Sequence, residues 1–155
     1  METKFLFPNA LKKIGWILFI PALIAGIFYM ASEFEWNFLE ARVFALFNDE
    51  LIKGSKFAVM IDNNLTDEII GILLLVGAVL VAFSKEKEED EFIMKLRLES
   101  LLWATYVNVI FILFCLVFVY GFVFFNAMLL NMYSLLILFI IRFNIIMIRT
   151  KKRVA

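Results

Sequence analysis

Four long apolar segments, each bounded by charged residues, fill most of this 155-residue chain. The hydrocarbon core of a bilayer is about 30 Å thick, and about 20 apolar helical residues cross it because a helix rises about 1.5 Å per residue. The segments are Ile14–Ala31, Ile69–Phe83, Leu101–Phe125 and Met128–Ile148. The pattern predicts four membrane-spanning helices in an all-α four-helix transmembrane bundle.

The composition supports a bilayer rather than water as the solvent. Hydrophobic residues make up 64% of the chain, against about 45–50% in soluble domains. A soluble fold of this length has too little interior to bury so much apolar surface. We therefore expect a single integral membrane domain, residues 1–155, in contact with lipid. The formal net charge is zero, so the total charge gives no support for a nucleic acid partner.

The distribution of basic residues predicts the orientation, because Lys and Arg near span ends tend to stay in the cytoplasm. The connection 32–68 carries three basic and eight acidic residues, whereas the connection 84–100 carries four basic residues in 17 positions. Further basic residues precede the first span and follow the last. We expect both termini and an inner charged hairpin, 84–100, in the cytoplasm, with a small extracytoplasmic loop region at 32–68.

The first segment has a second interpretation as a cleaved signal peptide. Its basic start fits, but its 18 apolar residues exceed the usual length of about 7–15, and no small-x-small cleavage site precedes Glu33. An uncleaved span is favoured. Pro21 lies inside it and is expected to kink the helix, because proline lacks the N–H that the helix ladder needs.

Several kinds of chemistry lack the residues they require. The chain has no histidine and one cysteine, Cys115, inside the third segment. The missing histidines argue against His-ligated haem, histidine metal sites and His-based acid–base catalysis. Phosphate-binding glycine loops, nucleophile elbows and carboxylate pairs inside a span are also absent from the sequence. We expect no cofactor, no bound metal and no enzymatic activity.

The outer connection allows more than one local structure. Alternating aromatic and polar residues at 34–38 predict an extended segment, whereas apolar positions within 39–47 also fit one helix face. Residues 56–61, followed by the turn-forming residues 62–64, predict a short strand entering a turn. This region either caps the bundle and binds a partner or ligand, or lies on it as an aromatic-anchored loop, which the sequence favours.

The inner hairpin carries a run of carboxylates that we treat as a candidate partner-docking elbow. A helix is expected to begin near Asp90 and to continue into the third span, because apolar residues after it follow helical spacing. A solvated hairpin tip explains the same residues without a partner. The elbow consists of Glu88, Glu89, Asp90 and Glu91.

Polar residues inside the spans form a candidate intramembrane cluster. Arg142 falls within the last span, and Asn108 of the antiparallel third span is expected at a similar depth. We predict a hydrogen bond between them, with Glu99 as the nearest countercharge and Asn144 in the same region. Buried polar groups in bilayers are costly and often functional. The sequence favours a simpler interpretation, in which Arg142 snorkels to headgroups and the asparagines only join helices.

Small residues predict where two of the helices meet. Ala22 and Gly26 lie four residues apart in the first span, and Ala78 and Ala82 do so in the second. Such spacing permits close approach of helices in a membrane. The first two spans are therefore expected to pack tightly.

Four stretches of the sequence carry a resemblance, namely Asp67–Gly71, Ala82–Ile93, Leu96–Leu101 and Trp103–Ala104. Over roughly residues 67–144, the chain resembles a group of small uncharacterised bacterial four-helix integral membrane proteins without an assigned function. It implies four helices in a bacterial inner membrane. It implies no activity and no catalytic residues.

These observations favour a non-enzymatic membrane accessory, scaffold or signalling subunit that engages a protein partner, or a second copy of the chain, through its loops. The alternative is a small transporter or channel component with a polar path near Arg142. A membrane enzyme acting on lipid ranks third. The sequence names no substrate or partner.

Overall fold

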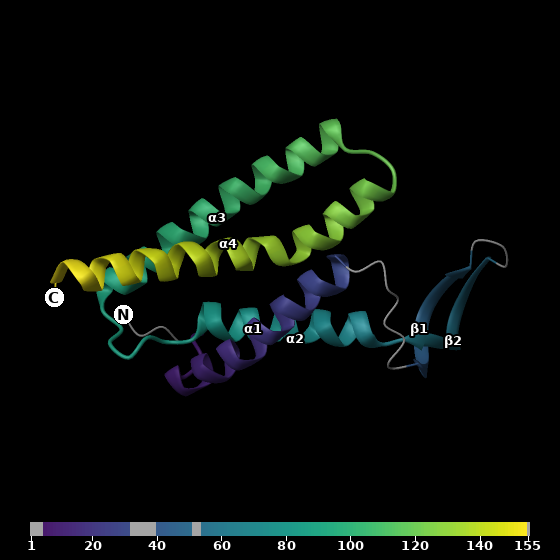
Figure 1. Ribbon diagram of the computed structural model, residues 1–155, viewed down its shortest axis with the longest axis horizontal. Coiled ribbons are helices and arrows are strands. Elements are labelled where there is room, and N and C mark those ends of the chain that lie inside the picture. Colours follow the sequence, from purple (N-terminus) through teal and green to yellow (C-terminus); the bar gives the residue numbers. More distant parts are fainter. Residues whose placement is uncertain (1–4, 32–39, 51–53, 155) are drawn as a thin grey trace. The chain divides into compact units, whose positions relative to one another are not determined.

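The computed structural model describes residues 5–31, 40–50 and 54–154, which form four helices and a pair of strands (Figure 1). In chain order these are α1 (Asn9–Ala31), β1 (Glu40–Glu50), β2 (Gly54–Asn64), α2 (Thr66–Phe83), α3 (Glu91–Phe118) and α4 (Phe122–Val154). All four helices are long and apolar enough to cross a membrane, which confirms the predicted spans at that level. The strands are an addition to the predicted all-α bundle.

The turn between α3 and α4 lies earlier than predicted. We expect the third span to reach Phe125, but α3 ends at Phe118. Gly121 follows with a φ of 71°, a left-handed conformation that only glycine adopts without steric cost. The helix cannot continue through that conformation. The aromatic residues from Phe122 onward therefore form the first turn of α4.

The starts of α2 and α3 are fixed by side chains that accept hydrogen bonds from free backbone N–H groups. Asp90 caps α3, because its carboxylate accepts from the backbone N–H of Ile93 at 2.8 Å. This confirms a helix that begins beside Asp90 and runs into the third span. At α2, the side-chain oxygen of Asn64 accepts from the backbone N–H of Thr66 at 3.1 Å and from its hydroxyl at 2.6 Å.

The chain divides into two compact units. The helical unit comprises Met1–Ile20 and Leu74–Ala155, and so holds the start of α1, the end of α2, α3 and α4. The hairpin unit comprises Pro21–Leu73 and holds the rest of α1, both strands and the start of α2. Pro21 lies inside α1.

Within the helical unit, the backbones of α1 and α2 touch at two glycines. A Cβ atom on Gly77 would lie 2.7 Å from the backbone nitrogen of Phe19 and 2.9 Å from its Cα. A Cβ atom on Gly15 would lie 2.9 Å from both the Cβ of Leu80 and the backbone nitrogen of Val81. The predicted tight packing of these helices is confirmed. The predicted small residues of α2 are buried beside this contact, namely Ala78 and Ala82.

The segment before α1 is hydrogen-bonded to the segment after α2. The backbone N–H of Phe7 donates to the carbonyl of Phe83 at 2.9 Å, and Lys85 donates in turn to the carbonyl of Phe7 at 2.8 Å. The Asn9 side-chain amide donates to the carbonyl of Lys85 at 2.7 Å. These bonds hold the first turn of α1 against the start of the inner charged hairpin, residues 84–100.

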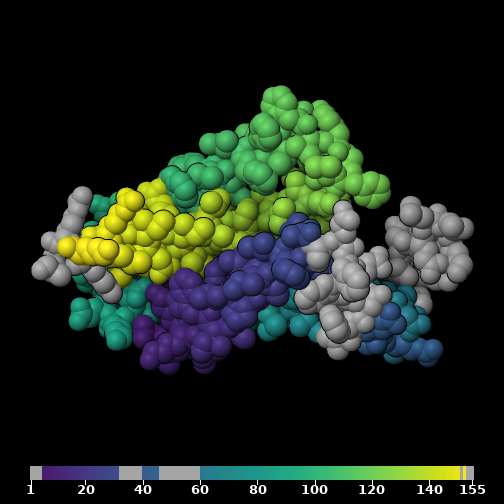
Figure 2. All heavy atoms as spheres, in the orientation of Figure 1, coloured from purple at the N-terminus to yellow at the C-terminus, as the bar shows by residue number. Residues whose placement is uncertain are grey.

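Stacked phenylalanines connect α2 with α4 in the core of the helical unit. The Phe139 ring is fully buried, with its centre 6.1 Å from that of Phe83 and 5.7 Å from that of Phe143. The Lys12 ammonium of α1 lies 5.7 Å from the centre of the Phe143 ring. In the space-filling view, the yellow end of α4 accordingly lies against the purple first turns of α1 (Figure 2).

In the hairpin unit, β1 and β2 pair antiparallel over their full lengths, from Glu40 opposite Asn64 to Glu50 opposite Gly54. The predicted strand at 56–61 is confirmed and is longer than expected. Residues 62–64 continue it instead of forming the predicted turn, and Asp62 pairs with Arg42 at 3.2 Å. The helical interpretation of 39–47 is wrong, because residues 40–50 form a strand. The predicted extended segment 34–38 lies outside the described residues.

Large apolar side chains remain exposed along every helix. Ile17 of α1 is 70% exposed, Ile72 of α2 61%, Ile110 of α3 66% and Ile148 of α4 56%. Soluble monomers rarely expose apolar patches larger than a few hundred Å². Four long helices with such surfaces are suited to a lipid environment.

Candidate functional site

The buried polar site between α3 and α4 is built from amide and hydroxyl groups. Asn108 of α3 is 8% exposed, and its side-chain oxygen accepts from the Asn131 amide at 2.9 Å and from the Ser134 hydroxyl. The Ser134 hydroxyl also lies 3.0 Å from the carbonyl oxygen of Asn131. Such bonds join helices in a membrane, where unpaired polar groups are costly.

Asn108 belongs to a row of buried residues spaced four positions apart along α3. Ser100, Ala104 and Asn108 are all buried on α3, and small residues at this spacing allow a neighbouring helix to approach. This spacing could have indicated the contact with α4. Asn131 and Ser134 are visible as polar interruptions of the last apolar segment, but sequence alone gives them no partner.

The predicted hydrogen bond between Arg142 and Asn108 is wrong. The Arg142 guanidinium carbon lies 4.8 Å from the centre of the Trp103 ring, a cation–π contact. Its Nε atom is buried and has no hydrogen-bond partner among the described residues. The early turn explains the error: α4 begins at Phe122 rather than near Met128, so Arg142 lies opposite a residue nearer to the start of α3.

The other two members of the predicted intramembrane cluster are not brought to Arg142. Glu99 is exposed, and in the described part of the chain it makes no ion pair with Arg142. The side-chain amide of Asn144 donates to the carbonyl of Ile140 in its own helix at 2.7 Å. The four predicted cluster residues therefore do not form one site.

The elbow carboxylates divide into two that hold the fold and two that face outward. Glu89 pairs with Arg97 at 3.0 Å, and it accepts from the backbone N–H of Glu86 at 2.8 Å. The side chains of Arg97 and Glu89 are only 11% and 15% exposed. Asp90 caps α3, as described above. Glu88 and Glu91 are exposed, so these two remain open to a docking partner.

Arg97 also ties the elbow to α2 and α4. Its Nη2 donates to the backbone carbonyl of Ser84 at 3.2 Å, and its guanidinium carbon lies 5.4 Å from the centre of the Phe143 ring. A second ion pair, between Lys12 and Glu86, joins α1 to the inner charged hairpin just before the elbow. Neither ion pair could be predicted from the sequence, because each joins residues too far apart for helical spacing to relate them.

The hairpin presents an apolar pair together with two open strand edges. Phe44 and Met60 lie opposite each other, and they are 60% and 66% exposed. The exposed ion pair of Arg42 with Asp62 lies two pairs along the ladder, and so on the same face of the hairpin. Within the described residues the sheet has only these two strands. Each strand therefore has one edge that no other described strand occupies.

Neither a metal site among the described residues nor a known relative indicates a function for the chain. The described residues contain no group of three or more His, Cys, Asp or Glu side chains that could hold a metal ion. Comparisons of the chain with protein-family models, with curated proteins and with solved structures found no match.

Proposed function

We propose that this chain is a non-enzymatic accessory subunit of a membrane assembly, which binds a protein partner through the β1–β2 hairpin. The observation that carries the proposal is the hairpin itself, which has two edges that no other described strand occupies, beside an exposed Phe44–Met60 pair. A strand edge offers a row of unpaired N–H and C=O groups that another chain can extend.

Physical reasoning about small sheets supports a partner. An isolated two-stranded hairpin is marginally stable in water, and a third strand or a packed partner is usually needed. The strands here are 11 residues each, longer than the usual strand of about five or six residues. A long ladder with an apolar pair on one face gives a partner both hydrogen bonds and a place for side chains.

Contacts within the helical unit support a topology with both termini on one side of the membrane. The start of α1 is bonded to the segment after α2, and both α3 and α4 meet that segment through Arg97 and Phe143. With four crossings, this arrangement supports a cytoplasmic location for the termini and elbow, where the basic residues cluster. The hairpin, which connects α1 with α2, would then lie on the extracytoplasmic side.

The alternative of a transporter or channel with a polar path near Arg142 stays a prediction. Arg142 packs on the Trp103 ring, and Asn108 is bonded to Asn131 and Ser134. Side chains engaged between neighbouring helices are less available to line a path. These contacts favour the accessory role.

Site-directed photocrosslinking tests the proposal in intact membranes. A photoreactive amino acid at Phe44 should capture a discrete partner, whereas the same group at Ile110, which is equally exposed on the apolar middle of α3, should capture lipid. The variant with Phe44→Lys and Met60→Lys should lose a partner that co-purifies stoichiometrically in mild detergent. The variant with Glu88→Gln and Glu91→Gln should keep it.

The reverse result would reject hairpin docking. If the elbow variant loses the partner and the hairpin variant keeps it, the docking surface is the cytoplasmic elbow. If the purified chain is alone and supports substrate flux that Arg142→Leu abolishes, the transporter alternative is correct instead.

A further inference from the structure

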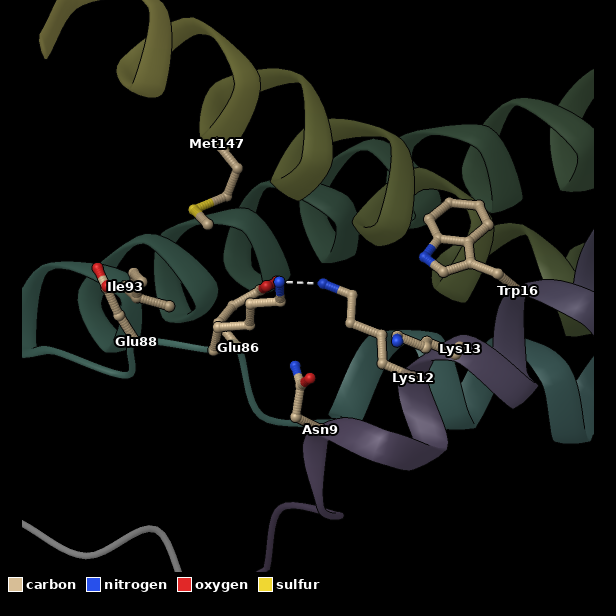
Figure 3. Close-up of a pocket in the computed structure, with 9 residues that line it drawn as sticks. Asn9, Lys12, Lys13, Trp16, Glu86, Glu88, Ile93 and Met147 are labelled. Carbon is tan, nitrogen blue, oxygen red and sulfur yellow. Dashed lines mark hydrogen bonds and ion pairs between the residues drawn. The ribbon is translucent and has the colours of Figure 1, made fainter. Parts of the chain in front are cut away.

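A cleft of about 430 Å³ opens in the helical unit, where the first turns of α1 meet the elbow, the start of α3 and the end of α4 (Figure 3). Its lining has a charged part and an apolar part. The charged part consists of Lys12, Lys13, Glu86, Lys87 and Glu88. The apolar part consists of Trp16, Ile93 and Met147.

The charged part of the cleft is built around a fixed ion pair. Lys12 and Glu86 form the ion pair that Figure 3 marks with a dashed line, and each side chain is only 13% exposed. The Lys12 ammonium also lies 5.7 Å from the centre of the Phe143 ring. Asn9, which lines the same cleft, is held by its bond to the carbonyl of Lys85. These residues already have partners within the chain, and they fix the shape of the cleft.

The remaining charges of the cleft have no such partners. Lys87 and Lys13 are exposed, and neither makes an ion pair or a hydrogen bond with another described residue. Glu88 is exposed and likewise unpaired within the described residues. Because the charges of Lys12 and Glu86 cancel, the lining is left with the ammonium groups of Lys13 and Lys87 and the carboxylate of Glu88. The cleft therefore has one positive charge in excess, which favours an anion.

The apolar part of the cleft indicates that the anion carries a hydrophobic chain. Trp16 lies on the second turn of α1, close to the charged end of the helix, and tryptophan is enriched where membranes meet water. In Figure 3, Met147 points from α4 toward the same space as the Lys12 and Glu86 side chains. The cleft lies at the ends of the apolar helices, where lipid headgroups would be found.

We propose that this cleft binds the headgroup of an anionic phospholipid. Lys13 and Lys87 contact the phosphate, and Trp16 and Met147 contact the first methylenes of the lipid chains. A soluble phosphate ester shares the phosphate chemistry but leaves the apolar wall bare, so a lipid is the ligand that uses the whole lining. The inference depends on the chain lying in a membrane and is independent of docking at the hairpin.

Fluorescence quenching of Trp16 measures this binding directly. The full chain with Trp36→Phe and Trp103→Phe, which leaves Trp16 as its only tryptophan, is titrated in mild detergent with phosphatidylglycerol that carries brominated acyl chains. Brominated phosphatidylcholine, which has no net charge, is the lipid control. Quenching by phosphatidylglycerol should saturate, and quenching by phosphatidylcholine should not saturate over the same range.

Two charge-matched double variants separate a site from general attraction. Lys13→Gln with Lys87→Gln should weaken phosphatidylglycerol binding by about thirtyfold, because each lysine near an anionic surface contributes about a factor of five. Lys95→Gln with Lys152→Gln removes the same charge from exposed positions that do not line the cleft, and should change binding little. Glu88→Gln should strengthen it. Thermal unfolding of each variant checks that the fold is kept.

Three outcomes would overturn the proposal. Equal weakening by both double variants would mean that only general charge matters. Saturable quenching by phosphatidylcholine would mean that the headgroup charge is not recognised. If glycerol 3-phosphate displaced the lipid at the same concentration as phosphatidylglycerol itself, the ligand would be a soluble phosphate ester, because the apolar wall would contribute nothing.

Discussion

Replacing Gly77 with alanine should weaken the contact between α1 and α2, since the new methyl group has no free space. Its carbon would lie 2.7 Å from the nitrogen of Phe19, 2.9 Å from its Cα and 3.1 Å from its Cβ. Non-bonded carbon contacts are normally about 3.5–4.0 Å. The nearest atoms belong to backbone, which cannot rotate away, so α1 has to retreat by about 1 Å. Overpacking of this kind costs about 1–3 kcal/mol.

Gly26→Ala provides the matched control. A Cβ atom at Gly26 would meet only the Cγ2 atom of Ile70 at 3.7 Å, which is an ordinary contact. Alanine is the better helix former by about 0.5–1 kcal/mol, so this variant should be neutral or more stable than wild type. Both variants gain the same intrinsic helix propensity, because each replaces glycine with alanine. The difference between their unfolding free energies therefore isolates the steric cost at Gly77, about 1–3 kcal/mol.

Unfolding in mixed micelles measures both variants on the full chain. The protein in dodecyl maltoside is unfolded by increasing the fraction of dodecyl sulfate, and loss of structure is followed by tryptophan fluorescence and circular dichroism. Gly77→Ala should unfold at a lower dodecyl sulfate fraction than wild type. If it is as stable as Gly26→Ala, the backbones of α1 and α2 do not touch, and the reasoning is refuted.

Variants at three further places test the remaining contacts in the same assay. Arg97→Gln should cost about 3 kcal/mol because it leaves the nearly buried carboxylate of Glu89 without a countercharge. The control Lys95→Gln, at an exposed position, should change stability by less than about 0.5 kcal/mol. Equal effects of the two substitutions would argue against the ion pair. Asn108→Leu and Asn131→Leu should each destabilise, with a coupling of about 0.5–1.5 kcal/mol in the double variant, and strictly additive losses would mean that the two residues do not interact. Gly121→Ala should cost about 1–2 kcal/mol because of its positive φ, and an unchanged midpoint would indicate a different turn.

The spans could be predicted from sequence because bilayer thickness fixes the length of apolar helix required. The start of α3 was predictable too, since Asp90 stands directly before a run with helical spacing. The end of α3 was not. Phe122 and the aromatic residues after it are as apolar as a span, and only the backbone of Gly121 shows that the chain turns there.

This one boundary determines how well the candidate site could be predicted. A shift of the turn by several residues changes which α3 residue faces Arg142. Arg142 therefore contacts Trp103 instead of the predicted Asn108. The orientation of the elbow carboxylates could not be predicted for a different reason. Charge alone cannot tell that Glu89 turns inward to Arg97 while Glu88 faces outward, because that depends on how the chain folds back before the α3 cap.

The joint between α3 and α4 relies on asparagine and serine, and neither side chain gains or loses a proton at ordinary pH. Its hydrogen bonds, unlike a carboxylate or histidine contact, have no acid or alkaline limit within the range that living cells meet. The hydrogen bonds between α3 and α4 should therefore be equally strong whether or not the water on either side of the membrane is acidified.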